Sequence, residues 1–564
     1  GKHEIDQPRW QRVLDGSHVA PRRMRPVGRA SQLLDFGRPL PAAEAREIAE
    51  MLRRQPDVEW VVPNERERRL QVPDDPYYPA TAPGSGQWWL RRVSGSDGNV
   101  LADRLRGVAG FEAAWSTGIA GSLGDPSTIV AVLDTGITSG AYAHPELAGK
   151  VIAGYDFVSE VEYANDGDGR DADPSDPGDW VDHGDLANPA FAGCLLEASS
   201  WHGTLIAGQI AALTNNGQGV AGIGWNTQVL AVRVAGKCGA TVSDIVDGIR
   251  WAAGLPVVGV PIINPNPARI INISFGGDAA CNAEYQAAID EVWNSKGAIV
   301  VAAAGNEHAG LSRPASCDKV VGVVGLNRDG FKNNYSNFDA RDSNIGAKAV
   351  IATVGGDDDG ADSGLWAPYL ADDGILTVDN CGSTVPRMPS TCPNGPYAFL
   401  FGTSFSAPIV SGAAALMLAV NKNLTAQQLV DGLKASARPH VTSPLIGTCS
   451  WDNPGRCICT TSTCGAGILD AEQALRYAEA VRTDQPYTAP NWPTVVLDNP
   501  EIRAAVQVSP KDRDPNPPVA DGSTSKGGGG GGGATGIGWL ILLALATVEL
   551  ARLRLRPTAR VRRS

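Results

Sequence analysis

The chain has 564 residues, 43% hydrophobic and 19% charged, so it is long enough for roughly two to four folded units with full cores. Its formal charge of −13 is concentrated in the middle, because residues 1–80 are nearly neutral and residues 527–564 are basic. An acidic body argues against nucleic acid as a partner and is compatible with bound cations or simply with a soluble surface.

Residues 1–75 are expected to form a small α+β unit. AAEAREIAEMLRR (42–54) has helical spacing, and VEWVVP (58–63) alternates like a short strand. Residues 71–88 are rich in proline and turn-forming residues, which predicts a linker. No initiator methionine or apolar leader segment begins the sequence, so an exported chain would have lost its signal peptide.

From about residue 89 to 480 the pattern alternates between strands and helices. Apolar, β-branched runs appear at STIVAVLD, QVLAVRV, ARIINISF and GAIVVAAA, with helical stretches such as TLIAGQIAAL between them. Strands buried on both faces and interleaved with helices predict an α/β fold with a parallel sheet.

The C-terminal region changes character twice. Residues 481–526 are rich in proline and aspartate and predict an extended stalk, and seven glycines follow. The apolar run 534–548 precedes an arginine cluster, which predicts a single transmembrane helix with its arginines on the cytoplasmic side. An amphipathic or buried helix is the alternative.

Three short stretches supply the residue types of a nucleophilic hydrolase. IVAVLDTGI ends a buried strand with Asp134, SSWHGTLIAG starts a helix with His202, and FGTSFSAPIVSG starts another with Ser404. Serine is a poor nucleophile until a base such as histidine takes its proton, and a carboxylate fixes the histidine tautomer. Each residue also has a structural interpretation: a turn aspartate, a packed or capping histidine, a helix N-cap. Spacing alone does not decide between these interpretations.

A fourth stretch, VVAAAGNEHAG, places Asn306 at a strand end, where its side-chain N–H can face an oxyanion or simply form a turn. With it, the chain resembles the subtilisin-like (subtilase, S8) serine peptidases. Their Asp, His, oxyanion-Asn and Ser motifs match VAVLDTGI, HGTLIAG, AAAGN and GTSFSAP, in the family's chain order. The resemblance implies a three-layer subtilisin-like fold, a catalytic triad of Asp134, His202 and Ser404, and Asn306 as oxyanion donor.

The same resemblance implies positions for the substrate. Two groups match substrate-binding segments of the family: a strand that pairs with the substrate backbone, Ser274, Phe275 and Gly276, and a pocket wall, Ala303, Ala304 and Gly305. Glu307 would lie at the pocket rim, where it either favours basic substrate side chains or is simply solvated.

The two ends of the chain resemble processing segments. Residues 1–75 are similar to the propeptides that assist folding and inhibit secreted subtilases, with cleavage expected somewhere around residues 68–88, in the processing region that includes the linker 76–88. Residues 89–480 would then be the catalytic domain and residues 481–526 the stalk. The tail 527–564 resembles the GlyGly-CTERM sorting tails of Gram-negative bacteria, which a rhomboid-type protease removes; a permanent membrane anchor is the alternative. The implied product is a secreted, autoprocessed serine endopeptidase acting on proteins or peptides.

Two structural supports are expected. The loop NDGDGRDADPSDPGDW offers carboxylates for a calcium ion, as many subtilases bind calcium, with four candidate ligands: Asp166, Asp168, Asp171 and Asp173. The alternative is a solvated acidic loop. Ten cysteines without paired C-x-x-C motifs predict disulfides in an oxidising compartment. Neighbours along the chain suggest the partners, which sequence cannot fix: Cys194 with Cys238, Cys281 with Cys317, Cys381 with Cys392, Cys449 with Cys457, and Cys459 with Cys464.

Three rival hypotheses remain from the sequence. The first is a peptide-binding pseudoprotease, the second a surface-anchored adhesion protein, and the third a regulatory protease with one substrate. Covalent labelling by a serine-directed fluorophosphonate discriminates the pseudoprotease from an enzyme, and the presence of Asp134, His202 and Ser404 together argues against the adhesion protein.

Overall fold

The computed structural model describes residues 21–62, except 28–30, 39, 41 and 57, and residues 72–78, 86–93, 105–339, 348–357 and 374–498. The chain divides into two units, Gly1–Arg69 and Leu70–Ser564. The boundary therefore lies ahead of the expected one at residue 75. The predicted glycine stretch, transmembrane helix and arginine tail lie outside the described residues, as does most of the stalk.

The smaller unit contains a β-hairpin and a helix. β1 (Arg23–Val27) pairs antiparallel with β2 (Ser31–Asp35), and α2 (Ala42–Arg53) buries Ile48 and Leu52. The predicted helix is confirmed. The predicted strand at 58–63 is wrong for residues 58–62, which form no regular element.

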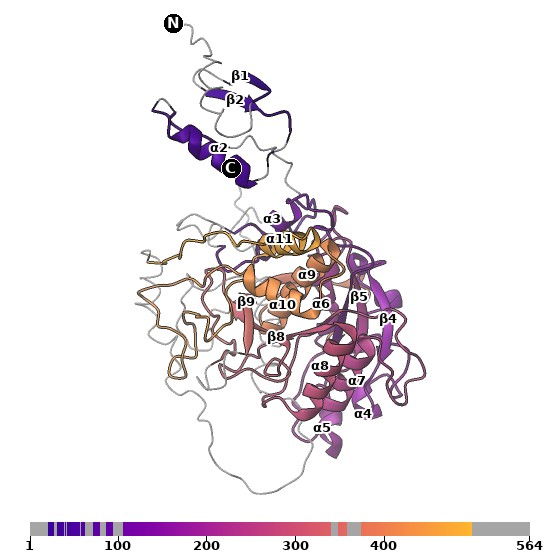
Figure 1. The fold of residues 1–564 in the computed structure, drawn as a ribbon. Helices are drawn as coiled ribbons and strands as arrows, with labels where there is room; N and C mark the ends of the chain where they lie inside the picture. The colour runs from indigo at the N-terminus through magenta and orange to yellow at the C-terminus, as the bar shows by residue number, and fades with distance from the viewer. Residues whose placement is uncertain are drawn as a thin grey trace, which may run out of the picture. The chain divides into compact units, whose positions relative to one another are not determined.

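Seven parallel strands form the sheet of the larger unit, in the order β4-β5-β3-β6-β7-β8-β9, which confirms the α/β prediction (Figure 1). The strands are β3 (Ile129–Asp134), β4 (Val151–Asp156), β5 (Gln228–Arg233), β6 (Ile270–Ile273), β7 (Ile299–Ala303), β8 (Val320–Leu326) and β9 (Ala349–Val354). The chain adds β4 and β5 on one side of β3 and β6 to β9 on the other. Ligand sites in such sheets lie at the carboxyl ends of the strands beside this reversal.

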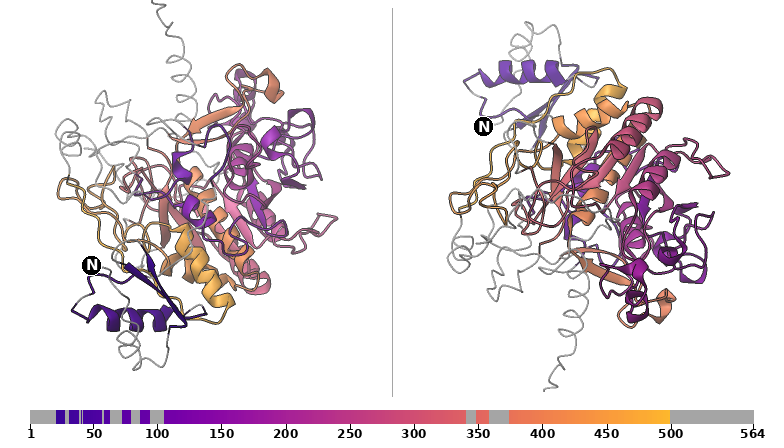
Figure 2. Two further views of the ribbon diagram at one scale, coloured as in Figure 1. Left: turned by 90° about the horizontal axis from the view of Figure 1, so that it is seen from above. Right: turned by 90° about the horizontal axis from the view of Figure 1, so that it is seen from below.

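Helices cover both faces of this sheet, as Figure 2 shows. Along β3, Val130 and Val132 contribute to one core while Ala131 and Leu133 contribute to the other, because successive side chains of a strand point to opposite faces of the sheet. The first core is covered by α6 (His202–Ala211), α9 (Thr403–Val420), α10 (Ala426–Ala435) and α11 (Ala471–Arg482), and the second by α7 (Val242–Ala252) and α8 (Ala283–Lys296).

Shorter elements connect these layers. β10 (Ile375–Val378) and β11 (Tyr397–Leu400) form an antiparallel pair. The short helices are α3 (Phe111–Trp115), α4 (Val161–Ala164) and α5 (His183–Leu186), with single 3₁₀ turns at Trp88–Leu90, Gly140–Tyr142, Pro145–Leu147, Pro189–Phe191 and Pro389–Thr391.

The segment expected to be a linker instead belongs to the larger unit. Asp75 is fully buried, and its carboxylate accepts hydrogen bonds from the backbone N–H groups of Asn215 and Asn216. Trp88 and Trp89 lie in the main core, and the Trp88 indole donates to a backbone carbonyl at 2.7 Å. The linker prediction is therefore wrong for residues 76–78 and 86–88. The large aromatic side chains in this proline-rich stretch are buried in the core, and the Trp88 indole N–H donates a hydrogen bond there.

Within the described residues, α9 is the helix long and apolar enough to cross a membrane. However, 94% of its 18 residues, Thr403–Val420, are buried inside the protein. It is thus the core helix of the larger unit. The apolar character of α9 reflects contact with β6, β7 and β8 on one side and other helices on the other.

Candidate active site

Asp134 and His202 meet at the carboxyl end of β3. Asp134 is the last residue of β3 and His202 the first residue of α6, and both are almost fully buried. Nδ1 of His202 lies 2.8 Å from Oδ1 and 3.0 Å from Oδ2 of Asp134. Asp134 also accepts a hydrogen bond from the backbone N–H of Thr135 at 2.8 Å. A buried carboxylate in this position fixes the imidazole orientation and assigns its proton to Nδ1.

The turn before His202 is held by hydrogen bonds that Ser200 and Trp201 donate to distant acceptors. Trp201 has a left-handed backbone with φ 52°, and its indole donates to the Gly382 carbonyl at 2.6 Å. The Asp179 carboxylate accepts from both the N–H and the hydroxyl of Ser200, at 2.6 and 2.7 Å. Burial raises the pKa of Asp179. No function was predicted for these residues from the sequence, because nothing in the separate stretches DPGDW and SSWHG indicates that they meet.

Ser404 lies in the first turn of α9 but does not cap it. The N-cap residue is Gly402, whose φ of 145° favours glycine, and no side chain caps the helix. The Ser404 hydroxyl donates to the Ser274 carbonyl at 2.6 Å, and the Ser274 hydroxyl donates to the Ser404 carbonyl at 2.8 Å. The His202 and Phe405 rings lie edge to face with centroids 5.9 Å apart, so the histidine adjoins this turn. The capping interpretation of Ser404 is therefore wrong.

Asn306 lies on the loop after β7 and contacts the same turn. Its Oδ1 accepts hydrogen bonds from the N–H and the hydroxyl of Thr403, both at 2.9 Å. Because Oδ1 is engaged by the two donors, the amide nitrogen Nδ2 is directed away from Thr403, toward the space beside Gly402. A donor fixed in this way beside a serine can stabilise a negative oxygen that forms there.

Glu307 is turned inward. Its Oε2 accepts from the backbone N–H of Asn306 at 2.8 Å and from Nδ2 of Asn337 at 2.6 Å. Burial raises the pKa of Glu307, and these hydrogen bonds oppose that rise. The carboxylate therefore binds its own loop at Asn306 and the neighbouring loop at Asn337, which neither the basic-specificity hypothesis nor the solvated alternative predicted.

The expected substrate segments adjoin this centre. Ser274, Phe275 and Gly276 directly follow β6, and the carbonyl of Ser274 already accepts the Ser404 hydroxyl. Ala303 ends β7, and Ala304 and Gly305 continue toward Asn306. A Cβ on Gly305 would lie 2.3 Å from Nδ2 of Asn337, so this position admits only glycine.

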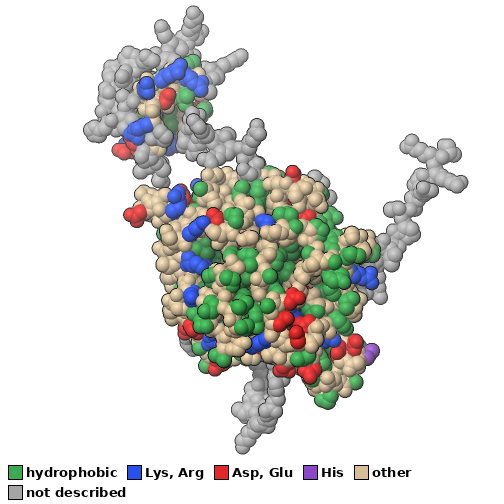
Figure 3. Space-filling view, turned by 90° about the vertical axis from the view of Figure 1, so that its right-hand side faces the viewer, with side chains coloured by type: hydrophobic (Ala, Val, Ile, Leu, Met, Phe, Trp, Pro, Cys, Tyr) green, Lys and Arg blue, Asp and Glu red, His purple; other side chains and the backbone are tan. Residues whose placement is uncertain are grey.

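The four aspartates proposed as calcium ligands are not brought together. Asp166 forms an ion pair with Arg233, while Asp171 accepts the Asp173 backbone N–H at 2.8 Å. Within the described residues, no group of three Asp, Glu, His or Cys ligand atoms from this loop lies within 4.8 Å of one another. Acidic side chains do gather on the face shown in Figure 3, but these four do not fit a calcium site.

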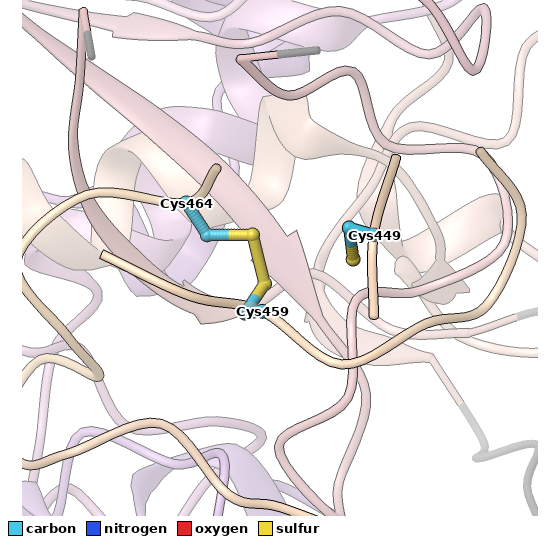
Figure 4. Close-up of side chains that lie close together, drawn as sticks. All are labelled: Cys449, Cys459 and Cys464. Atoms are coloured by element: carbon cyan, nitrogen blue, oxygen red, sulfur yellow. A yellow bond between two sulfur atoms is a disulfide. The ribbon is translucent and has the colours of Figure 1, made fainter. Parts of the chain in front are cut away.

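All ten cysteines are paired, in the expected partners. The disulfides join Cys194 to Cys238, Cys281 to Cys317, Cys381 to Cys392, Cys449 to Cys457, and Cys459 to Cys464. Figure 4 shows the sulfur of Cys449 close to the disulfide of Cys459 and Cys464. Since each of these sulfurs is already bonded to another, the cluster is a packed disulfide core and not a metal site.

Comparison with known proteins agrees with this fold. Residues 125–453 match the model of the subtilase family. An extracellular protease of Xanthomonas campestris is 40% identical over 354 residues, covering 62% of this chain and 51% of the relative. An extracellular basic protease of Dichelobacter nodosus is 34% identical over 476 residues, covering 83% of this chain and 65% of the relative. The chain thus matches about half to two thirds of the length of these relatives.

A solved structure of a protease from Pseudoalteromonas arctica is similar as well, with a TM-score of 0.54 and 35% identity. The alignment covers 72% of this chain and 100% of that one. The chain belongs to the subtilase family.

Proposed function

We propose that this chain is a secreted serine endopeptidase that hydrolyses peptide bonds through Asp134, His202 and Ser404. The hydrogen bond between Asp134 and His202, buried at the carboxyl end of β3 and adjoining the Ser404 turn, carries the proposal. Family membership supports it, and the relatives named as extracellular proteases support secretion.

The proposed reaction follows from the side chains. Nε2 of His202 takes the Ser404 proton while Oγ attacks the substrate carbonyl carbon, and Asp134 stabilises the imidazolium that forms. His202 then gives the proton to the leaving amine, and water repeats the sequence on the acyl-enzyme. The Ser404 hydroxyl must first leave the Ser274 carbonyl. A substrate N–H donated to that same oxygen would favour the rotation toward His202.

The negative oxygen of the tetrahedral intermediate needs donors. Nδ2 of Asn306 and the backbone N–H of Ser404, in the first turn of α9, are the proposed pair. The positive end of the helix dipole adds to their effect. The segments Ser274–Gly276 and Ala303–Gly305 would hold the substrate backbone and the residue before the scissile bond.

The maturation and sorting steps are also part of the proposal. Residues 1–69 form their own unit, as expected of a propeptide that inhibits and is then removed. Because Asp75, Trp88 and Trp89 are buried in the larger unit, we expect the mature chain to begin ahead of Asp74. The tail would tether the proenzyme to the membrane of a Gram-negative bacterium until a rhomboid-type protease releases it, or would remain as an anchor.

Calcium remains a proposal at the level of the family. Subtilases generally bind structural calcium, and the acidic surface of this chain is compatible with it. The four aspartates of the 166–173 loop are not supported as its ligands, and no catalytic step depends on the ion.

A peptide-binding protein without turnover is the second candidate. The hydrogen bond of Ser404 to Ser274 favours it, since this hydroxyl points at a carbonyl. Hydrolysis of a peptide by purified protein, beside Ser404→Ala, and mass spectrometry of both chains test the choice. An enzyme cuts the peptide and loses its first unit while the variant stays full length and inert. Equal behaviour of the two chains would refute the protease.

A further inference from the structure

A buried loop, Lys332–Asn337, connects the loop that carries Asn306 to the turn that carries Ser404. Asn337 is fully buried. Its side-chain oxygen and nitrogen and its backbone N–H and carbonyl all form hydrogen bonds. Its Oδ1 accepts from the N–H groups of Glu307 and Ala309 at 2.9 and 2.8 Å. Its own N–H donates to the Gly305 carbonyl at 2.9 Å. The side chain of Asn337 thus holds the backbone after Asn306, and its backbone N–H holds the residue before Asn306.

The amide nitrogen of Asn337 completes the arrangement through Glu307. Nδ2 donates to Oε2 of Glu307 at 2.6 Å, and that same oxygen accepts the N–H of Asn306 at 2.8 Å. Nδ2 also donates to the hydroxyl of Ser312 at 3.1 Å. The Glu307 carboxylate is therefore a bridge between Asn337 and the backbone of Asn306, and its charge faces donors of the protein.

The other end of the buried loop reaches the nucleophile turn. The hydroxyl of Tyr335 accepts the N–H of Gly402 at 2.8 Å, two residues before Ser404. The carbonyl of Tyr335 accepts the N–H of His308 at 3.1 Å. One tyrosine thereby contacts both loops, which fixes the distance between Asn306 and Ser404.

A buried lysine anchors this loop. Nζ of Lys332 donates to the carbonyls of Asn333, Asn334 and Ser336, at 2.9, 3.3 and 2.8 Å. Burial lowers the pKa of Lys332 to about 7. Three carbonyls on one amine give the loop a closed conformation, from which Asn337 projects toward Asn306.

We propose that Asn337 is a positioning residue for catalysis: together with the Glu307 carboxylate it holds the Asn306 backbone so that Nδ2 of Asn306 faces the oxygen of the tetrahedral intermediate. The inference rests on the proposed function and deepens it. It also assigns Glu307 a role as a hydrogen-bond acceptor within the oxyanion loop instead of a charge that selects basic substrates.

The test compares Asn337→Ala with Asn264→Ala in the mature enzyme. Asn264 is a similarly buried asparagine that donates to the Ala252 carbonyl at 2.9 Å, in a loop that holds no active-site residue. Asn337→Ala is expected to lower kcat by roughly 10–100-fold without a matching change in KM, because a small displacement of an oxyanion donor acts on the transition state. Asn264→Ala is expected to leave kcat and KM unchanged while lowering the melting temperature.

A double-mutant cycle separates a specific effect of Asn337 on Asn306 from a nonspecific loss of order in the active site. In the Asn306→Ala background, Asn337→Ala is expected to cause no further loss of kcat, since the donor it positions is gone. Equal kcat for Asn337→Ala and Asn264→Ala, or losses that multiply in the double variant, would overturn the inference. If the wild-type enzyme is itself inert, the proposed function fails first and this inference fails with it.

A second pair of variants keeps the test open if Asn337→Ala does not fold. Glu307→Ala removes the acceptor for the Asn306 N–H and is expected to lower kcat, while Glu307→Gln keeps an amide oxygen there and is expected to restore most of it. A loss in Glu307→Gln as large as in Glu307→Ala, or confined to substrates with lysine before the scissile bond, would show that the charge matters and refute the assignment.

Discussion

Nδ1 of His202 lies 2.8 Å from Oδ1 of Asp134, in a place that water barely reaches. In Asp134→Asn, the amide oxygen or the amide nitrogen faces Nδ1, and the imidazolium loses its counter-charge. We expect kcat to fall on the order of 10³–10⁴-fold, as for the same change in other serine proteases. Peptide hydrolysis by mature wild-type and variant enzymes measures this loss.

A buried carboxylate elsewhere provides the control. Asp470 caps α11 and forms an ion pair with Arg438 at 3.2 Å. Asp470→Asn keeps a capping oxygen and removes the ion pair, so we expect a lower melting temperature with unchanged kcat. If both variants lose kcat alike, Asp134 acts through stability and not through His202.

The two serines of the GTSFSAP motif are expected to differ. Ser404→Ala should abolish peptide hydrolysis and fluorophosphonate labelling, since it removes the attacking oxygen. Ser406, on the same helix, is fully buried and its hydroxyl donates to the Val354 carbonyl at 3.1 Å, so Ser406→Ala should cost stability and retain labelling. Labelling that survives in Ser404→Ala and disappears in Ser406→Ala would reverse the assignment.

The sequence predicted the parts of the site that lie at the ends of regular elements. Asp134 follows a run of β-branched residues, and His202 and Ser404 begin apolar helices, so their elements could be assigned from periodicity. The parallel order of the strands then places such ends at one edge of the sheet. Neighbouring positions along the chain were also enough to suggest the disulfide partners.

Contacts made by irregular segments could not be predicted in the same way. Asn337 lies on a loop without periodicity, and its hydrogen bonds go to residues about thirty positions away along the chain. The same holds for Asp75, whose partners are backbone N–H groups of a distant turn. Proline and turn residues around Asp75 indicated a linker, because composition does not reveal a single buried aromatic or carboxylate.

Two disulfides of very different span should contribute unequally to stability. Cys281 and Cys317 are 36 residues apart and enclose α8, β7 and Asn306, whereas Cys459 and Cys464 are 5 apart. Loop-closure entropy predicts a loss of about 4 kcal/mol of unfolding free energy without the first and about 2 kcal/mol without the second. Melting temperatures of the two double Cys→Ala variants, made in the inert Ser404→Ala background, measure the order. A larger loss from the short loop would contradict the entropic explanation.

The last prediction concerns Glu146, which is almost fully buried. Its carboxylate accepts hydrogen bonds from Nδ2 of Asn216 at 3.0 Å and from the hydroxyl of Tyr397 at 3.3 Å. Burial, with a smaller effect of the nearby Asp75 charge, raises the pKa of Glu146 to about 7. The folded protein therefore holds a proton between about pH 4.5 and pH 7 that the unfolded chain has already lost.

Because the folded state keeps this proton in the window, Glu146 itself lowers the free energy of unfolding as the pH rises from about 4.5 to 7. Glu146→Gln cannot ionise, so its free energy of unfolding should change more positively with pH over the same range than that of the unsubstituted protein. Burial lowers the pKa of the neighbouring His144 to about 4, so this histidine raises stability with pH in the same window and opposes Glu146. Burial also raises the pKa of Asp75, which acts in the same direction as Glu146. Both residues are present in both proteins, so the difference between the two slopes reports Glu146. Melting temperatures at pH 5, 6 and 7, again in the Ser404→Ala background, compare the two slopes. Equal slopes would mean that Glu146 is already ionised in the folded protein, as a bound cation at this carboxylate would cause.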